Sequence, residues 1–161
     1  MINFRLRLMI YLYEKSSKIY AALFKPHKKP WGIRKEQFAD YPEGSLGKAL
    51  GDFYEKYGFD VMPKLENHDV FHVLTNTGTE IQDEIAMQYL LLGNGKVSLY
   101  LLGMVSVGLL IYPEFWNYYM RSYQKGKHWK TFHNIEFKHL LQHSLAALQL
   151  TFACKSSVIH S

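Results

Sequence analysis

The chain has 161 residues, of which 48% are hydrophobic and 20% charged, and its net charge is +5. These values are typical of a packed domain and exclude an extensively disordered chain. The single cysteine, Cys154, excludes an internal disulfide framework and a thiolate zinc cluster, so a bound metal would need imidazole and carboxylate ligands. We therefore expect one domain over residues 1–161, with its core at about 30–152.

Charge is distributed unevenly along the chain. Residues 1–35 hold nine Lys/Arg and one acid, residues 36–120 hold four and twelve, and residues 121–161 hold six and one. A nucleic-acid binder would not gather its acids in a central block, so we expect no nucleic-acid partner. The pattern suggests that the basic ends face an anionic surface while the acidic middle binds a cation. The alternative is that the basic residues simply solvate loops.

Apolar residues recur with a helical period and strand-like alternation is scarce, which predicts an all-α fold of about six to seven helices. Ser45 is a candidate N-cap and Gly58 a candidate C-cap, and Thr79 with Gln82 resembles a capping box. In chain order, the predicted helices span residues 3–24, 46–57, 67–75, 80–92, 97–112, 113–124 and 135–152.

Two of these segments bear on membrane association. The N-terminal helix carries Arg5 and Arg7 among apolar residues and lacks a signal-peptide pattern, so we expect a structural helix that also lies on a membrane surface. Residues 97–113 carry no charge but are fewer than the roughly 20 residues needed to span a bilayer. We therefore expect a buried helix there, in a protein that is soluble or peripheral.

The candidate metal ligands are His68, Asp69, His72 and Glu84. Two histidines four residues apart share one helix face, Asp69 flanks that face, and Glu84 follows on the next helix. Imidazole and carboxylate ligands suit a divalent metal, zinc first, and also iron, manganese or cobalt. A chance pair is the alternative, since eight histidines in the chain also produce a second such pair, which we interpret as a solvated surface; it consists of His139 and His143.

The run His-Asp-x-x-His, eleven further residues and a glutamate resembles the metal-binding motif of the Coq4 family of coenzyme Q (ubiquinone) biosynthesis. The resemblance covers roughly residues 30–140 and includes the segments at 41–47, 72–75 and 83–88. The chain departs from the usual family pattern at three positions: two glycines are replaced by Asn76 and Asp83, and a frequent lysine is replaced by Gln88. The four presumed ligands are all retained, which suggests a divergent branch.

The resemblance implies an all-helical protein at a membrane surface, with a divalent metal beside a hydrophobic groove for a prenyl tail. It implies a role in ubiquinone synthesis, through oxidative decarboxylation of a prenylated hydroxybenzoate ring, through organisation of other quinone-biosynthesis proteins, or both. It also implies a cytoplasmic location on the inner membrane of a bacterial host, or on the matrix face of the mitochondrial inner membrane in a eukaryote. Individual catalytic residues are not assigned.

The residues expected to line the groove lie in and after the uncharged segment, and core packing is the alternative for them. We also expect a homodimer, because aromatic helices are exposed in this reading. Two rival functions remain open: a non-catalytic isoprenoid-binding or lipid-binding scaffold that organises biosynthetic enzymes, and a metal-dependent hydrolase. The expected groove residues are Tyr100, Met104, Gly108, Phe115 and Tyr119.

Overall fold

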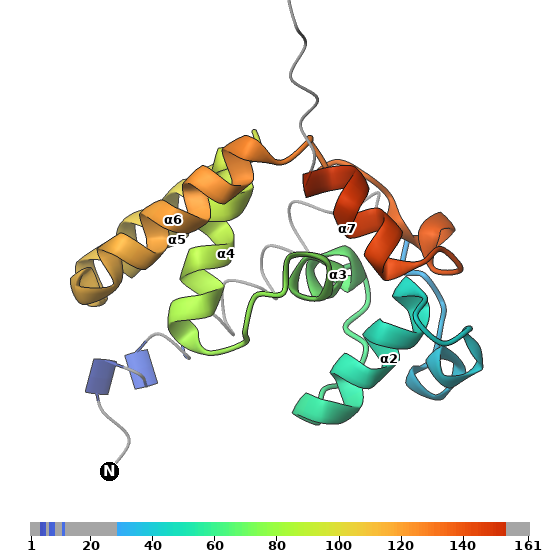
Figure 1. The fold of residues 1–161 in the computed structure, drawn as a ribbon. Helices are drawn as coiled ribbons and strands as arrows, with labels where there is room; N and C mark the ends of the chain where they lie inside the picture. The colour runs from blue at the N-terminus through green and yellow to red at the C-terminus, as the bar shows by residue number, and fades with distance from the viewer. Residues whose placement is uncertain (1–3, 6, 9–10, 12–28, 154–161) are drawn as a thin grey trace, which may run out of the picture.

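The computed structural model describes residues 4–5, 7–8, 11 and 29–153. This part of the chain forms six α-helices and three short 3-10 helices and contains no β-strand, which confirms the all-α prediction (Figure 1). In order they are η1 (Lys35–Asp40), α2 (Leu46–Tyr57), α3 (Glu66–Thr75), α4 (Ile81–Gly93), α5 (Leu99–Ile111), η2 (Pro113–Phe115), α6 (Trp116–His128), η3 (Phe137–Leu140) and α7 (Leu145–Ala153).

The expected N-terminal helix over residues 3–24 lies largely outside the described residues, and so does Cys154. The described residues among the first eleven are helical. One of them, Arg5, forms an ion pair with Glu114 at 2.9 Å, and its guanidinium lies 4.5 Å from the centre of the Tyr112 ring. The N-terminal segment therefore contacts the turn between α5 and α6.

The ends of α2 follow the capping residues expected from the sequence. The Ser45 hydroxyl accepts a hydrogen bond from the Lys48 backbone N–H at 3.2 Å, and Gly58 ends the helix with a φ of 65°. The capping box of α4, expected at Thr79 and Gln82, is wrong by one residue. Glu80 is the N-cap, and the carboxylate of Asp83 accepts the Glu80 backbone N–H at 3.2 Å. Acidic side chains suit this position because the helix N-terminus carries partial positive charge.

The expected helix over 135–152 is also wrong, because the structure divides it into η3 and α7. Between them, the carbonyl oxygens of Leu141 and His143 accept the backbone N–H groups of Gly47 at 2.8 Å and Leu46 at 2.9 Å. These N–H groups belong to the first turn of α2 and have no partner within their own helix. The break thus supplies hydrogen-bond acceptors for the first N–H groups of α2, and it holds the C-terminal segment against this helix.

Helix α4 is the centre of the fold and has apolar residues around its circumference. Every residue from Ile85 to Leu91 is buried. One side packs into a core shared with α2, α3 and α7, and the other packs against α5 and α6, as the two groups of helices in Figure 1 show. A helix that is apolar on all sides is expected to be enclosed by others. Residue Glu84, just before the buried run, consequently sits at the edge of the core.

Two glycines allow α4 and α6 to pack with their backbones in contact. A Cβ atom at Gly126 would overlap the carbonyl oxygen of Leu90, and a Cβ at Gly93 would overlap that of Tyr123. The nearby Asn94 side chain ties the end of this pair to the following loop, because its amide donates to the carbonyl of Gly126 at 3.2 Å. The α4–α6 contact is therefore rigidly defined at its C-terminal end.

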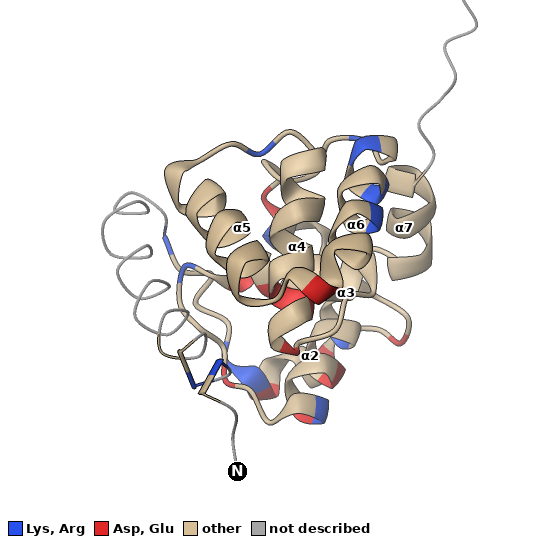
Figure 2. Cartoon of the chain, turned by 90° about the vertical axis from the view of Figure 1, so that its left-hand side faces the viewer, with Lys and Arg blue, Asp and Glu red and all other residues tan. Residues whose placement is uncertain are grey.

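Helix α5 is buried on one face only, which corrects the expectation of a buried helix. Leu101, Met104 and Gly108 face the interior, whereas Leu99 and Leu110 are 82% and 80% exposed. The helix carries no charged residue, as its uniform colour in Figure 2 shows. A charge-free helix with an exposed apolar face is a candidate contact surface.

A helix that crosses a bilayer needs roughly 20 predominantly apolar residues. Taken singly, none of the described helices is both long and apolar enough. The pair Leu99–Ile111 and Pro113–His128, which is bent by 105°, meets the length and composition requirement only when its two parts are combined.

Candidate metal centre

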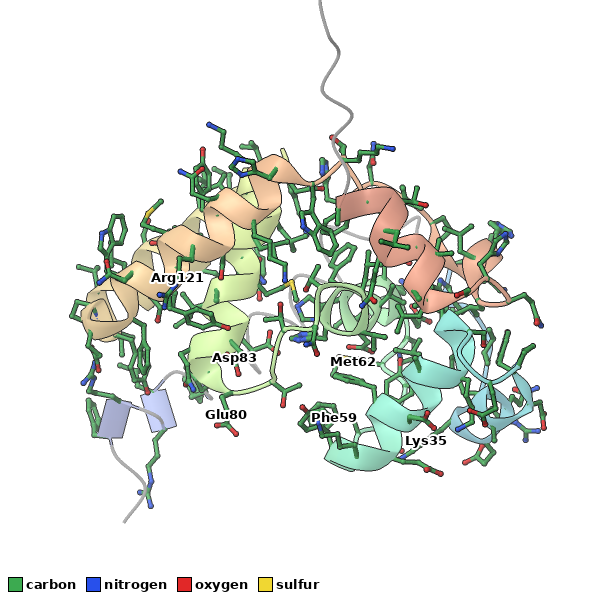
Figure 3. All side chains as sticks on the ribbon, in the orientation of Figure 1. Lys35, Phe59, Met62, Glu80, Asp83 and Arg121 are labelled. Carbon is green, nitrogen blue, oxygen red and sulfur yellow. The ribbon has the colours of Figure 1, made fainter. Side chains whose placement is uncertain are left out.

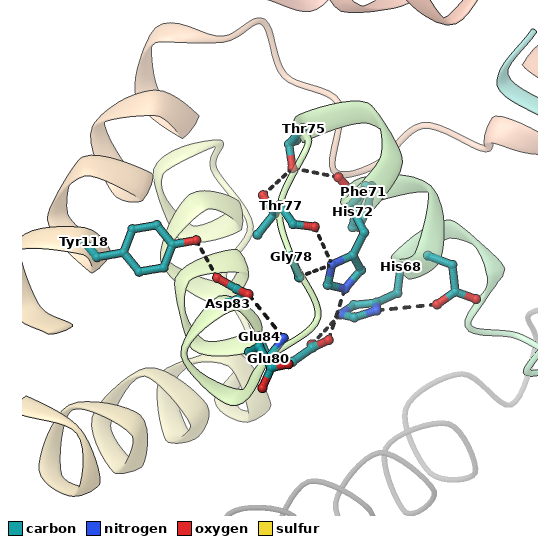
Figure 4. A network of polar contacts seen from close by, with 11 residues as sticks. His68, Phe71, His72, Thr75, Thr77, Gly78, Glu80, Asp83, Glu84 and Tyr118 are labelled. Carbon is teal, nitrogen blue, oxygen red and sulfur yellow. Dashed lines mark hydrogen bonds and ion pairs between the residues drawn. The ribbon is translucent and has the colours of Figure 1, made fainter. Parts of the chain in front are cut away.

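The site is built from one face of α3 and the first turn of α4 (Figure 4). His68 and His72 lie one turn apart on α3, and their rings are 4.9 Å apart. Both Nε2 atoms face Glu84: that of His72 lies 3.2 Å from Oε1, and that of His68 lies 3.5 Å from Oε2. One ligand atom from each of the three residues lies within 4.8 Å of the others. We call this group the His68–His72–Glu84 triad.

The turn between α3 and α4 brings Glu84 opposite the histidines. Asn76 ends α3 in the left-handed conformation, with a φ of 50°, and Thr77 N–H bonds to the His72 carbonyl at 3.0 Å. Asparagine is one of the few residues with a side chain that adopt this conformation readily. Asn76 therefore makes this turn without a glycine.

The environment of His72 prepares its Nε2 atom to bind a metal. The Nδ1 atom lies 2.8 Å from the carbonyl oxygen of Gly78, which can only accept a hydrogen bond. Nδ1 must therefore carry the proton, and the lone pair of the neutral ring is on Nε2, toward Glu84. Burial lowers the pKa of His72, but the hydrogen bond and charge of Glu84 outweigh burial and raise it overall.

The structure places Asp69 apart from the other three expected ligands. Its Oδ2 accepts a hydrogen bond from the hydroxyl of Tyr54 at 2.9 Å, and its Oδ1 lies 3.9 Å from Nδ1 of His68. Asp69 thus lies nearest Nδ1 of His68, whereas Nε2 of the same ring faces Glu84. Burial, together with the carboxylates of Asp69 and Glu66, raises the pKa of Tyr54 far above its usual value, so the phenol stays protonated.

The other acids near the motif have local roles. Asp83 accepts hydrogen bonds from the Glu80 backbone and, at 2.8 Å, from the hydroxyl of Tyr118. Burial and this hydrogen bond raise the pKa of Tyr118 to about 12. Figure 3 shows Glu80 and Asp83 at the N-terminal end of α4, where Glu80 is exposed. These two acids cap a helix, which accounts for their presence without a cation.

The second histidine pair is not assembled into a site. His139 lies in η3, His143 lies beyond its end, and both are exposed. A spacing of four residues brings side chains together only on a continuous α-helix, and the helix is broken here. The sequence interpretation of a solvated surface agrees with these positions.

The expected groove residues lie where α4, α5 and α6 meet. Met104, Gly108 and Tyr119 are buried, and Tyr100 and Phe115 are partly buried beside them. Tyr119 stacks on Tyr89 with ring centres 5.1 Å apart. Lipid binding at these residues remains a prediction.

An aromatic group that sequence reasoning missed lies next to the triad. Phe53 stacks on His72, with ring centres 5.7 Å apart, and also contacts Tyr57 and Phe59. Tyr57 and Phe59 are 36% and 41% exposed, and Met62 beyond them is also exposed. We call Phe53, Tyr57, Phe59 and Met62 the aromatic ledge. The i, i+4 spacing of Phe53 and Tyr57 was a signal in the sequence, but their position beside His72 depends on the packing of α2 against α3.

The donor set of the triad fits a divalent metal. Two imidazole nitrogens and a carboxylate oxygen are ligands that zinc accepts, and iron, manganese and cobalt accept them too. His72 is almost fully buried, and the other two side chains are largely buried, so the site is shielded from solvent. His68, His72 and Glu84 would hold such an ion.

Fold and site together define an all-α domain with a possible two-histidine, one-glutamate metal centre between α3 and α4. The family model described as Coenzyme Q (ubiquinone) biosynthesis protein Coq4 matches residues 61–156, more than half of the chain. The chain belongs to the Coq4 family of ubiquinone biosynthesis proteins. The matched residues include the whole triad.

A solved structure supports the same fold. A crystal structure of a candidate ubiquinone biosynthesis protein from Nostoc punctiforme PCC 73102 superposes with a TM-score of 0.65. The match covers 96% of this chain and 83% of the other, at 19% sequence identity. At this identity the match establishes the fold alone. A search of curated protein sequences finds no match to this chain.

Proposed function

We propose that this protein performs a metal-dependent step of ubiquinone biosynthesis at a membrane surface, the oxidative decarboxylation of a prenylated hydroxybenzoate ring. Membership of the Coq4 family supports the pathway, and the His68–His72–Glu84 triad is the observation that carries the proposal of a metal-dependent reaction. The location that follows is the cytoplasmic side of the inner membrane in a bacterium, or the matrix side of the mitochondrial inner membrane in a eukaryote.

The triad suits a carboxylate substrate. A bound divalent metal would supply a Lewis acid that polarises the ring carboxylate. The protein residues would hold and orient that ion: Gly78 fixes the His72 ring through its carbonyl, and Glu84 balances part of the positive charge. The shielded position of the three ligands favours charge interactions, since these are stronger away from water.

The aromatic ledge is the proposed contact for the apolar part of the substrate. Tyr57 and Phe59 are partly exposed and contact Phe53, which stacks on His72. An aromatic substrate ring packs favourably against aromatic side chains of this kind. The flexible Met62 side chain would adapt to a neighbouring prenyl unit. This arrangement would place the ring close to the triad while the tail extends along the ledge.

The exposed face of α5 is the proposed membrane contact. Leu99 and Leu110 are among its exposed apolar side chains, Val97 is exposed just before the helix, and Trp116 is exposed at the start of α6. Tryptophan favours the headgroup level of a bilayer. A peripheral protein with this surface would have direct access to a lipid-soluble quinone precursor.

The proposal is tested by turnover. Protein loaded in turn with zinc, iron, manganese or cobalt is incubated with a prenylated 4-hydroxybenzoate in vesicles, under air, and the product is analysed by mass spectrometry. We expect the wild type to release the carboxyl group as CO2 and to gain a ring hydroxyl, with dioxygen from the air as the two-electron oxidant that is reduced to hydrogen peroxide, and we expect no product in Glu84→Gln.

Two other results would contradict the proposed reaction. Tight binding of the isoprenoid without turnover, under every metal, would favour the scaffold that organises other biosynthetic enzymes. Hydrolysis of phosphate or ester substrates by the metal-loaded protein would favour the hydrolase.

A further inference from the structure

The segment from the middle of α4 to the loop after α6 is strongly basic. Residues 85–135 contain five Lys/Arg and a single acid. That acid, Glu114, lies in the turn between α5 and α6, where it already pairs with Arg5 at 2.9 Å. The five basic residues are Lys96, Arg121, Lys125, Lys127 and Lys130. The segment therefore carries positive charge that no acid of its own balances.

Three of these lysines gather where α4 and α6 end and α5 begins. The backbones of α4 and α6 touch there, since a Cβ at Gly93 would lie 3.1 Å from the backbone nitrogen of Lys127. The Asn94 amide donates to the carbonyl of Lys130 at 3.1 Å, and Lys96 follows Asn94 by two residues. Figure 2 shows Lys and Arg on the upper part of α6 and in a loop beside it. We call Lys96, Lys127 and Lys130 the basic corner.

The basic corner adjoins the exposed apolar face of α5. Val97 directly follows Lys96 and is 72% exposed, and Leu99, the first residue of α5, is 82% exposed. Leu102 and Leu110 continue the same face, because they are also exposed and are spaced by about whole helical turns. Lysines therefore stand at one end of an apolar helix surface.

We propose that the basic corner and the exposed face of α5 form one surface that binds a bilayer of anionic phospholipids, with the three lysines at the headgroup phosphates. This inference rests on the membrane contact in the proposed function and adds the class of lipid that the contact selects. Charge complementarity decides the partner. A neutral bilayer would engage the leucines alone and a soluble polyanion the lysines alone, whereas an anionic bilayer matches both.

Vesicle binding tests the inference directly. Wild type and the double variant Lys127→Gln, Lys130→Gln are sedimented with vesicles of phosphatidylcholine alone, and with vesicles of equal parts phosphatidylcholine and phosphatidylglycerol. We expect the wild type to bind the mixed vesicles more tightly. The double variant should bind them about 30-fold more weakly, which is about fivefold for each lysine near an anionic surface. Its binding to phosphatidylcholine alone should be unchanged, because the leucines are intact.

Matched controls separate the basic corner from net charge. Lys35→Gln, Lys56→Gln removes the same charge from η1 and α2, and Figure 3 shows Lys35 beside α2, on the other side of the molecule from α6. This control should bind the mixed vesicles like the wild type, and so should Lys127→Arg, Lys130→Arg, which keeps the charge. Added KCl should weaken wild-type binding to the mixed vesicles only, since salt screens exposed charges.

Circular dichroism identifies any variant that unfolds. Lys127 lies near the end of α6, whereas Lys130 lies beyond it and is exposed. If the double variant is unfolded, the comparison therefore rests on Lys130→Gln, with an expected loss of about fivefold.

The possible failures are distinguishable. Equal wild-type binding to the two kinds of vesicle, or equal losses in the two double Lys→Gln variants, would overturn the selection of anionic lipid and leave α5 as a neutral membrane contact. Binding to neither kind of vesicle would overturn the membrane contact as well, while turnover of a detergent-solubilised substrate would still test the metal-dependent reaction. Binding of a short DNA duplex as tightly as the mixed vesicles would overturn the inference by assigning the basic corner to a soluble polyanion.

Discussion

Glu84 connects the two helices that form the site, because it extends from the first turn of α4 toward both histidines of α3. Without a metal, a carboxylate between two imidazoles is stable when one of the rings is protonated. When both rings are neutral, the three groups can act together as metal ligands. Glu84 raises the pKa of His72, so metal binding should displace a proton from this ring and weaken as the pH falls through the pKa of His72.

Substitution of His72 tests which histidine pair binds the metal. His72→Ala should reduce the metal content of the purified protein to near zero, because it removes the most buried ligand and the one fixed by Gly78. His139→Ala is the control and should retain full metal content. The check is elemental analysis of both variants beside the wild type, and equal losses in the two would show that the site has been assigned to the wrong residues.

The ligand atoms of His68, His72 and Glu84 lie close together in the structure, whereas the position of Asp69 depends on a long-range contact. Spacing on a single helix places Asp69 near the histidines but does not say what it faces. Its partner Tyr54 comes from another helix, fifteen residues earlier. The same limit applies to the aromatic ledge, whose place beside His72 depends on how α2 packs. A sequence indicates residues that share a helix face more readily than residues that meet across helices.

At the scale of elements, both ends of α2 were predictable because their caps are local. Ser45 and Gly58 bound α2 through contacts within one turn, and the sequence shows both. The break before α7 was not predictable, because the carbonyls of Leu141 and His143 are held by N–H groups almost a hundred residues away. The apolar pattern of residues 135–152 continues through this break, although the backbone carbonyls at the break accept hydrogen bonds from α2.

The close contact of α4 and α6 predicts a sharp difference between two glycines. Gly126→Ala should lower the free energy of unfolding by about 3 kcal/mol or more, because the new Cβ would overlap the carbonyl of Leu90 and force the helices apart. Gly103→Ala meets no neighbouring atom and should raise stability by up to about 1 kcal/mol through helix propensity. Urea unfolding followed by circular dichroism measures both changes. Similar effects in the two variants would contradict this account of the α4–α6 contact.

At the scale of the whole molecule, metal removal should leave the fold in place. The two hydrophobic cores are built from residues outside the triad, so a chelated protein should keep its helical circular dichroism. Its melting temperature should fall, since a ligand at 100 times its dissociation constant adds about 2.7 kcal/mol. Loss of helical signal after chelation would indicate a structural metal.

Membrane binding should depend on the exposed face of α5. The double variant Leu99→Glu, Leu110→Glu should bind phosphatidylcholine vesicles at least about tenfold more weakly, because burying even part of two leucines is worth more than 1.4 kcal/mol. The control is Leu150→Glu, which changes an exposed leucine on α7. Co-sedimentation measures all three proteins, and equal binding by all three would rule out α5 as the contact.

The most direct test of the central claim is the metal content of the purified wild type compared with Glu84→Ala. The account predicts about one divalent ion per wild-type chain and almost none in Glu84→Ala, with the same helical circular dichroism in both. Absence of metal from the wild type, or equal metal in the two proteins, would contradict a metal centre formed by His68, His72 and Glu84.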